Sequence, residues 1–383
     1  MAVSCFSNSF YCRQSNRNVW SARLWRTNDT ETLRRAKHVE QEDRNRLILL
    51  SLVLVGTILR FHNIASVWFG FDEAETLNLG QAHWFTFERI LWVREMNMVG
   101  YYALVRFWLN LDPDLSHSTL TFVRTLSALF SIATIPTLYA LGKKLFNENV
   151  GLLAAGLLAI NAFHIKHAQN ARSYSLFVFL VTLATFLLVD NIKKPHPKWV
   201  AYACIWVFAV YVHVFAFLFL AAHLIVMMYV GLRPRIGQLA CLFVAIMPMA
   251  LWTALHHRGQ PLDWVQPTTV RSVAELFSIF VGNDGFILLF IVVAPVIVAH
   301  VLRPREEQTS VKLVLTWAVA PIALAIMASF VQPCFVPRFL IPCLPATTLL
   351  TAASIERIKA LYAVILLALI VFGMLNGAQP IGA

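Results

Sequence analysis

Long runs of apolar residues, separated by short polar segments, dominate the chain. The runs are apolar all round rather than alternating, which indicates helices rather than barrel strands. A helix needs about 20 such residues to cross a bilayer. The pattern therefore predicts an all-α polytopic membrane protein with about eleven transmembrane helices, within a range of about 10–12. The predicted spans are residues 45–61, 121–142, 149–164, 173–190, 199–213, 214–230, 237–255, 286–301, 311–331, 339–354 and 360–376.

Two apolar runs do not have the length of a single span. Residues 199–230 would form a helix of about 48 Å, which is too long for one crossing, so we expect two short helices that turn near His213. Residues 98–111 are too few to cross the bilayer, and they include Arg106. We therefore expect them to lie at the membrane surface, within a long first outer loop at residues 62–120.

The basic residues gather on one side of this predicted topology. The chain has 31 Lys and Arg against 20 Asp and Glu, a formal net charge of +11. If residues 98–111 do not span, 21 of those 31 fall in the N-terminal arm and in loops on the same side. The positive-inside rule places that side in the cytoplasm. The charge is thus an orientation signal, and it gives no reason to expect a nucleic-acid partner.

Composition supports a membrane protein. Hydrophobic residues make up 58% of the chain and charged residues 13%, about half the charged share of a soluble domain. The predicted organisation is a basic cytoplasmic arm at residues 1–44, a membrane domain at 45–376 and a short outer tail at 377–383. Material for a site lies mainly on the outer side, in loop 62–120 and loop 256–285.

Three carboxylates, Asp72, Glu73 and Glu75, open the first outer loop next to three aromatic residues. One interpretation is a solvated loop whose aromatic side chains anchor it at the membrane interface. The other is a carboxylate held at the membrane surface as a general base, with the aromatic rings excluding water around it.

A second polar segment follows the third predicted span, at an outer turn between apolar helices. It holds His164, Lys166, His167, Gln169, Arg172 and Tyr174. Either the turn is simply polar, with its cations reaching the lipid headgroups, or it forms a cationic, donor-rich pocket for a phosphate. His164 and His167 are three residues apart and could share a helix face, but no third metal ligand is evident. No cofactor is firmly implied, and a divalent metal has no support.

Two further residues stand at outer turns. Arg338 is the only charged residue near the mouth of its span. It is either an anchor at the membrane interface or another ligand for an anion. His213 lies between two aromatic-rich helices, where a lone histidine is more often a satisfied polar residue than a catalyst.

Taken together, the motifs resemble glycosyltransferase family 39, the bacterial relatives of protein O-mannosyltransferases and of the lipid A aminoarabinose transferase, within the C superfamily of membrane glycosyltransferases. The resemblance covers roughly residues 45–376. It rests on the following segments in order: Asp72-Glu73, Glu95-Met96-Asn97, Tyr101-Tyr102-Ala103-Leu104 with Trp108, Arg124 to Phe130, Leu141 to Phe146, Asn161 to His164, Gln169 to Tyr174, Tyr211-Val212-His213 and Pro337 to Pro342. Many relatives have a proline pair where this chain has Val99-Gly100.

This resemblance implies a bacterial inner-membrane enzyme with surface helices in its first outer loop. Its donor would be a sugar linked to polyprenyl phosphate, and its acceptor an extracytoplasmic glycan, lipid or protein. Asp72 would be the base of an inverting displacement, with Glu73 orienting it or binding the sugar. Arg172, Arg338 and Lys166 would hold the donor phosphate. Candidate substrate-binding residues are Glu95, Asn97, Tyr102, His164, His167, Gln169, Tyr174 and His213.

The alternative function is a membrane transporter or flippase of lipid-linked sugars. Transporters tend to place charged or broken helices at mid-membrane. Here the ionisable residues gather at one face, and no inverted repeat is evident, which favours the enzyme.

Overall fold

The computed structural model describes residues 39–90, 96–111, 119–193, 198–232, 236–256, 264–281 and 308–357, with single residues inside 294–300 and 364–371. It divides into two units, residues 1–50 and 51–383. Most of the predicted arm and the whole predicted tail lie outside the described residues, as do most of the predicted spans 286–301 and 360–376. Within the first unit, residues 39–50 are helical.

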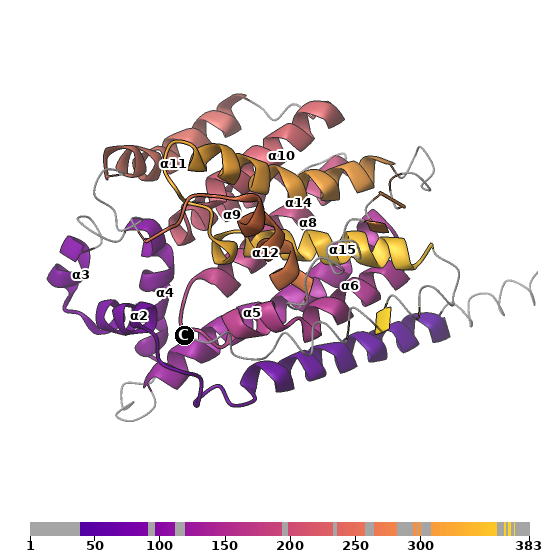
Figure 1. Ribbon diagram of the computed structural model, residues 1–383, viewed down its shortest axis with the longest axis horizontal. Helices are drawn as coiled ribbons and strands as arrows, with labels where there is room; N and C mark the ends of the chain where they lie inside the picture. The colour runs from indigo at the N-terminus through magenta and orange to yellow at the C-terminus, as the bar shows by residue number, and fades with distance from the viewer. Residues whose placement is uncertain are drawn as a thin grey trace, which may run out of the picture. The chain divides into compact units, whose positions relative to one another are not determined.

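Every regular element of the described residues is helical, in agreement with the predicted class (Figure 1). In the second unit, residues 51–61 are helical. The α-helices after them are α2 (Phe71–Gln81), α3 (Trp84–Ile90), α4 (Val99–Leu109), α5 (Thr119–Leu145), α6 (Glu148–Ile160), α7 (Ala162–Ala168), α8 (Tyr174–Lys193), α9 (Trp199–Val212), α10 (Ala216–Val230), α11 (Ile236–His256), α12 (Val270–Val281), α14 (Gln308–Ser329) and α15 (Leu344–Ile355). Short 3-10 turns are η2 (Met96–Met98), η3 (Pro337–Phe339) and η4 (Ile341–Cys343).

Three of the described helices, α5, α8 and α14, are long and apolar enough to cross a membrane. The pair α6 and α7 makes a fourth candidate, bent by 60° at its break. Shorter apolar helices include α9 and α10. The structure thus supports a bundle of apolar helices, while the predicted number of about eleven spans stays a prediction.

One predicted span, 149–164, is not a continuous helix. The chain leaves helical geometry at Asn161, whose side-chain oxygen accepts a hydrogen bond from the His164 backbone N–H and so caps α7. Asparagine is among the preferred N-cap residues because its short side chain competes with the helical backbone. The sequence prediction missed this break because both halves are apolar.

The turn predicted near His213 is present. Tyr202 on α9 and His223 on α10 meet across it, with the Tyr202 hydroxyl 3.0 Å from His223 Nδ1. In one continuous helix these residues would be about 30 Å apart. Residues 199–230 are therefore two helices that run back along each other.

Helix α4 has 11 residues, about 16 Å of helix, too short to cross a bilayer. It packs against α2, α5 and α9. A Cβ built on Gly100 would lie 3.1 Å from the Tyr211 carbonyl oxygen, a close approach between α4 and the end of α9. A small residue at this position therefore lets the two elements meet.

Helices α5 and α6 lie side by side (Figure 1). At their contact Gly142 faces Gly151, and a Cβ on Gly142 would come within 2.7 Å of the Gly151 Cα.

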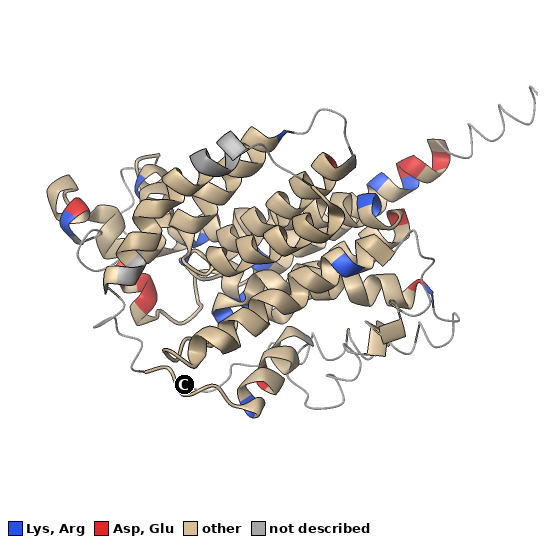
Figure 2. Cartoon of the chain, turned by 90° about the horizontal axis from the view of Figure 1, so that it is seen from above, with Lys and Arg blue, Asp and Glu red and all other residues tan. Residues whose placement is uncertain are grey.

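The Lys143 end of α5 carries two ion pairs, Lys143 with Glu148 and Lys144 with Asp190. Along their middle sections the described helices carry few charged residues (Figure 2). Arg124 lies 19 residues before Lys143 on α5, or about 28 Å along its axis, close to the thickness of a hydrocarbon core.

Candidate functional site

A fully buried ion pair connects helix α2, in the loop predicted to be the first outer one, to the helical bundle. Glu73 lies in the first turn of α2 and Arg124 near the start of α5, and both side chains are 0% exposed. Arg124 donates to both carboxylate oxygens of Glu73, through Nε at 2.9 Å and Nη2 at 2.6 Å. The Ala171 backbone N–H donates to the same carboxylate at 2.7 Å. Three segments that are distant in sequence are thereby joined.

Arg124 also fixes the path of the loop before α2. Its Nη1 donates to the carbonyl oxygens of Ile64 and Val67, and its Nη2 to that of Trp68. Of the two roles predicted for Glu73, orienting Asp72 or binding the sugar, these contacts favour the first. Its carboxylate is engaged inside the protein, and we assign Glu73 the role of holding α2 in place.

Asp72 lies next to Glu73 but on a different face of α2, with 39% of its side chain exposed. Its Oδ2 lies 3.4 Å from Arg338 Nη1. Arg172 lies beside it, with Nη1 donating to the Asp72 backbone oxygen at 3.2 Å and to the Tyr102 hydroxyl at 3.2 Å. The structure thus brings together four of the predicted site residues: Asp72, Tyr102, Arg172 and Arg338.

Buried hydroxyl groups support the backbone that carries Arg172. Ser127 Oγ on α5 donates to the Arg172 carbonyl at 3.2 Å, and the Tyr101 hydroxyl lies 3.0 Å from the same Oγ. Burial is the main cause that raises the pKa of Tyr101 above its ordinary value of 10.0. Tyr101 therefore stays protonated and donates to Ser127. Sequence reasoning did not find this support, because each hydroxyl lies on an ordinary apolar helix.

Aromatic rings flank Arg338. Its guanidinium carbon lies 5.1 Å from the centroid of the Trp264 ring and 5.7 Å from that of Phe339. Such cation–π contacts hold the planar group while its edge stays available for an anion. Arg338 is 34% exposed, so a ligand can reach it.

Arg60 was not among the predicted site residues, yet it is fully buried and determines the position of His164. Its Nη2 donates to His164 Nδ1 at 2.8 Å, and its Nε to Ser131 Oγ at 2.6 Å. The remaining N–H groups meet the carbonyl oxygens of Gly56, Leu158 and Ala159. The last two carbonyls belong to the end of α6, where a cation compensates the helix dipole. The available signal was an ionisable residue at the end of an apolar span.

Two other residues that were predicted to bind substrate have hydrogen-bond partners within the protein. Gln169 Nε2 donates to the carbonyl oxygens of Arg60 at 3.2 Å and His62 at 2.7 Å, which end a helix. Asn97 Oδ1 accepts from the Val214 N–H at 2.9 Å, fastening η2 to the turn between α9 and α10. We therefore assign both amides to the framework.

Lys166 is exposed on α7, and among the described residues no ion pair or hydrogen bond joins it to Asp72 or Arg338. Glu95 lies outside the described residues. The described part of the chain contains no group of three or more His, Cys, Asp and Glu side chains placed to hold a metal ion.

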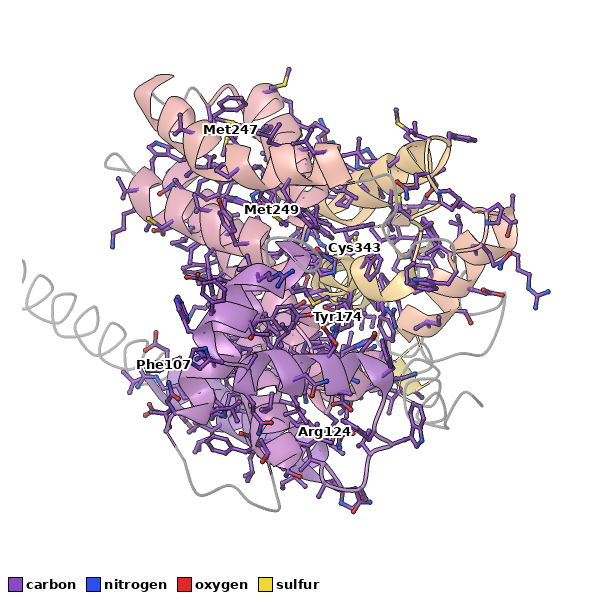
Figure 3. All side chains as sticks on the ribbon, turned by 90° about the vertical axis from the view of Figure 1, so that its left-hand side faces the viewer. Phe107, Arg124, Tyr174, Met247, Met249 and Cys343 are labelled. Atoms are coloured by element: carbon purple, nitrogen blue, oxygen red, sulfur yellow. The ribbon has the colours of Figure 1, made fainter. Side chains whose placement is uncertain are left out.

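His167, Tyr174 and His213 form an aromatic cluster behind Arg338. The Tyr174 ring centroid lies 5.0 Å from that of His167 and 5.9 Å from that of His213. Phe339, next to Arg338 in sequence, contacts both Tyr174 and His213. Figure 3 shows Tyr174 inside the bundle among side chains from several helices. The structure thus places these three predicted residues beside the cation that faces Asp72.

The sequence is similar to one family of known proteins. The model of the family described as dolichyl-phosphate-mannose-protein mannosyltransferase matches residues 103–255, less than half of the chain. No curated protein matches the sequence. The family match confirms the predicted resemblance to membrane glycosyltransferases.

Solved structures with a similar fold include those of two such enzymes. The oligosaccharyltransferase AglB from Archaeoglobus fulgidus, in complex with an inhibitory peptide and a dolichol-phosphate, has a TM-score of 0.58 at 13% identity, over 88% of this chain and 56% of AglB. ArnT from Cupriavidus metallidurans has a TM-score of 0.55 at 13% identity in the apo state, over 84% of this chain and 61% of ArnT. Its structure bound to undecaprenyl phosphate has a TM-score of 0.53. At this identity the likeness shows the fold, and the chain spans little more than half of each relative.

Proposed function

We propose that the chain is an integral-membrane glycosyltransferase that moves a sugar from a polyprenyl-phosphate donor to an acceptor hydroxyl on the outer side. The carrying observation is the position of Asp72, a half-exposed carboxylate with Arg338 at 3.4 Å and Arg172 beside it. The family match and the fold support this proposal, since the ArnT and AglB structures hold undecaprenyl phosphate and dolichol-phosphate respectively.

The proposed reaction is a single displacement at the anomeric carbon, with inversion. Asp72 accepts the proton of the acceptor hydroxyl as that oxygen bonds to the carbon. The bond to the phosphate oxygen breaks, and its electron pair leaves with the lipid phosphate. Arg338 and Arg172 stabilise the charge that grows there. Fixed donors of this kind are typically worth about 3–4 kcal/mol each. The leaving group is already an anion and needs no general acid.

Measuring how tightly the protein binds the lipid phosphate of the donor tests the proposal most directly. Arg338→Ala is expected to weaken binding of polyprenyl phosphate by about 10–100-fold, because it removes a hydrogen bond to a charged group worth about 1.5–3 kcal/mol. Arg172→Ala should also weaken binding. It would in addition remove the hydrogen bonds from Arg172 to the Tyr102 hydroxyl and to the Asp72 backbone oxygen on α2. Binding to the purified protein in nanodiscs measures both.

The matched control is Arg271→Ala, which removes an 89% exposed guanidinium from α12. It should leave the affinity unchanged. Equal affinities for the Arg338, Arg172 and Arg271 variants would remove the two site residues from donor binding. Release of polyprenyl phosphate from a lipid-linked sugar by the purified protein separates an enzyme from a flippase, which moves its cargo intact.

The proposed orientation gives a second test. We expect the Asp72 face to be extracytoplasmic and the Lys143 end of α5 to be cytoplasmic, because the topology predicted from the sequence puts the basic loops on the Lys143 side. Single cysteines at positions 75 and 143, in a cysteine-free background, can be labelled in intact cells with an impermeant reagent. Labelling at position 75 alone is the expected result. Labelling at position 143 alone would invert the orientation and place the reaction on the other side.

A further inference from the structure

Arg338 and the three ring side chains of the cluster behind it carry buried polar atoms that have no hydrogen-bond partner among the residues that the structure describes. These atoms are His167 Nε2, Tyr174 Oη, His213 Nε2 and Arg338 Nε. They come from α7, α8, the turn between α9 and α10, and η3. The three ring side chains are at most 7% exposed. An unpaired buried polar group is costly, so a gathering of four at one place indicates a ligand that supplies their partners.

The geometry makes three of the four atoms hydrogen-bond donors. The Phe215 backbone N–H donates to His213 Nδ1 at 3.2 Å. A nitrogen that accepts this bond carries no proton, so the proton of the neutral ring lies on Nε2. Arginine Nε–H can only donate, and a Tyr hydroxyl donates readily. Their natural partners are oxygen atoms with lone pairs, such as the hydroxyl and ring oxygens of a sugar.

Aromatic surfaces accompany these donors. His213 stacks on Phe177, with 4.9 Å between centroids and 5° between planes, and Phe339 covers Tyr174 and His213. Flat apolar faces next to a small number of placed polar groups are typical of small-molecule sites, where the faces supply contact area and the polar groups fix orientation.

The charges of the cluster disfavour a cationic ligand. The one charged side chain among the four is Arg338, which pairs with Asp72. A second cation, Arg172, donates a hydrogen bond to the Asp72 backbone oxygen. Two of the three carboxylates of α2 are engaged, Asp72 with Arg338 and Glu73 with Arg124, and the third, Glu75, lies one turn further along the helix. An ammonium group placed here would meet guanidinium groups of the same sign.

We propose that the cluster of His167, Tyr174, His213 and Arg338 holds the sugar of the donor and selects an uncharged sugar over an amino sugar. This inference rests on the proposed function and adds the substrate class to it. Specificity of this kind is expected to be strong, because a site built from buried donors rejects ligands that leave those donors unpaired.

Tyr174→Phe provides a sharp test because the hydroxyl that it removes has no partner within the described part of the protein. A framework role for this hydroxyl predicts a loss of stability. A binding role predicts a loss of sugar recognition with stability unchanged. Tyr202→Phe is the matched control. Its hydroxyl lies 3.0 Å from His223 Nδ1, so its removal should lower the thermal midpoint and leave sugar recognition unchanged.

The probes are polyprenyl phosphate alone, polyprenyl phosphate carrying mannose, and the same lipid carrying 4-amino-4-deoxyarabinose. Dissociation constants are measured for the full chain in nanodiscs. The wild type should bind the mannose-linked lipid at least about 10-fold more tightly than the amino-sugar lipid. Tyr174→Phe should lose about 5–20-fold in affinity for the mannose-linked lipid, as expected for one neutral hydrogen bond of about 1–2 kcal/mol. Its affinity for polyprenyl phosphate alone and its thermal midpoint should not fall.

Each contrary result has a distinct meaning. Equal wild-type affinity for the two sugar-linked lipids, or a preference for the amino sugar, overturns the inference and leaves the proposed function standing. If Tyr174→Phe binds the mannose-linked lipid as tightly as the wild type, the inference is likewise overturned and the proposed function still stands. Failure of the wild type to bind polyprenyl phosphate itself overturns the proposed function, and the inference falls with it.

Discussion

Asp72→Asn is expected to slow sugar transfer by at least about 100-fold while donor binding survives. The substitution keeps the size and polarity of the side chain and removes its basicity, and general-base catalysis typically contributes about 10²–10⁴-fold. The structure indicates that the variant will fold. The Asp72 side chain is 39% exposed, and the bond from Arg172 is made to its backbone oxygen, which the substitution keeps. Single-turnover release of polyprenyl phosphate from a lipid-linked donor, in membranes that contain the acceptor, measures the rate.

Glu75→Gln is the matched control, since Glu75 lies one turn later on the same helix and is also partly exposed. We expect this variant to transfer at close to the wild-type rate. The assignment of Asp72 would be abandoned if its Asn variant bound the donor and turned over normally. A loss of similar size in both variants would point instead to the negative charge of α2 as a whole.

The two neighbouring carboxylates show what the sequence could and could not predict. Asp72 and Glu73 look equivalent in the sequence, and either could have been the base. Successive residues of a helix point about 100° apart, so α2 turns one carboxylate toward the bundle and leaves the other half-exposed. The partner that decides the matter, Arg124, is 51 residues away. No local pattern reveals a pairing over that distance.

The helices were predicted best where a local rule was sufficient. Length predicted that residues 199–230 divide into two helices, and length together with Arg106 and the distribution of basic residues predicted that residues 98–111 do not span. The structure has α9, α10 and the short α4 there. The break at Asn161 was missed, because an asparagine between two apolar halves gives only a weak signal. The roles of Arg60, Gln169 and Asn97 were also beyond the sequence, since each is defined by backbone groups of a distant segment.

Arg124→Ala is expected to destabilise the protein by about 3–5 kcal/mol, as is typical when one partner of a buried ion pair is removed. The Glu73 carboxylate would be left buried with the Ala171 N–H as its remaining bond from the described residues. The carbonyl oxygens of Ile64, Val67 and Trp68 would lose the donor that holds the loop before α2. Arg124 can be followed in Figure 3. The thermal midpoint and the yield of monodisperse protein in detergent both measure the effect.

Two comparisons isolate the buried charge as the cause. Arg271→Ala breaks an ion pair whose members are 89% and 55% exposed, and exposed pairs are worth only about 0–1 kcal/mol, so its thermal midpoint should hardly move. The double variant Arg124→Met with Glu73→Leu removes both charges and fills much of the same volume. It should be more stable than Arg124→Ala, because replacing a whole buried pair by apolar side chains is much less costly than stranding one member. If Arg124→Ala were as stable as Arg271→Ala, the pair would not hold α2, and the separate roles assigned to Asp72 and Glu73 would lose their structural basis.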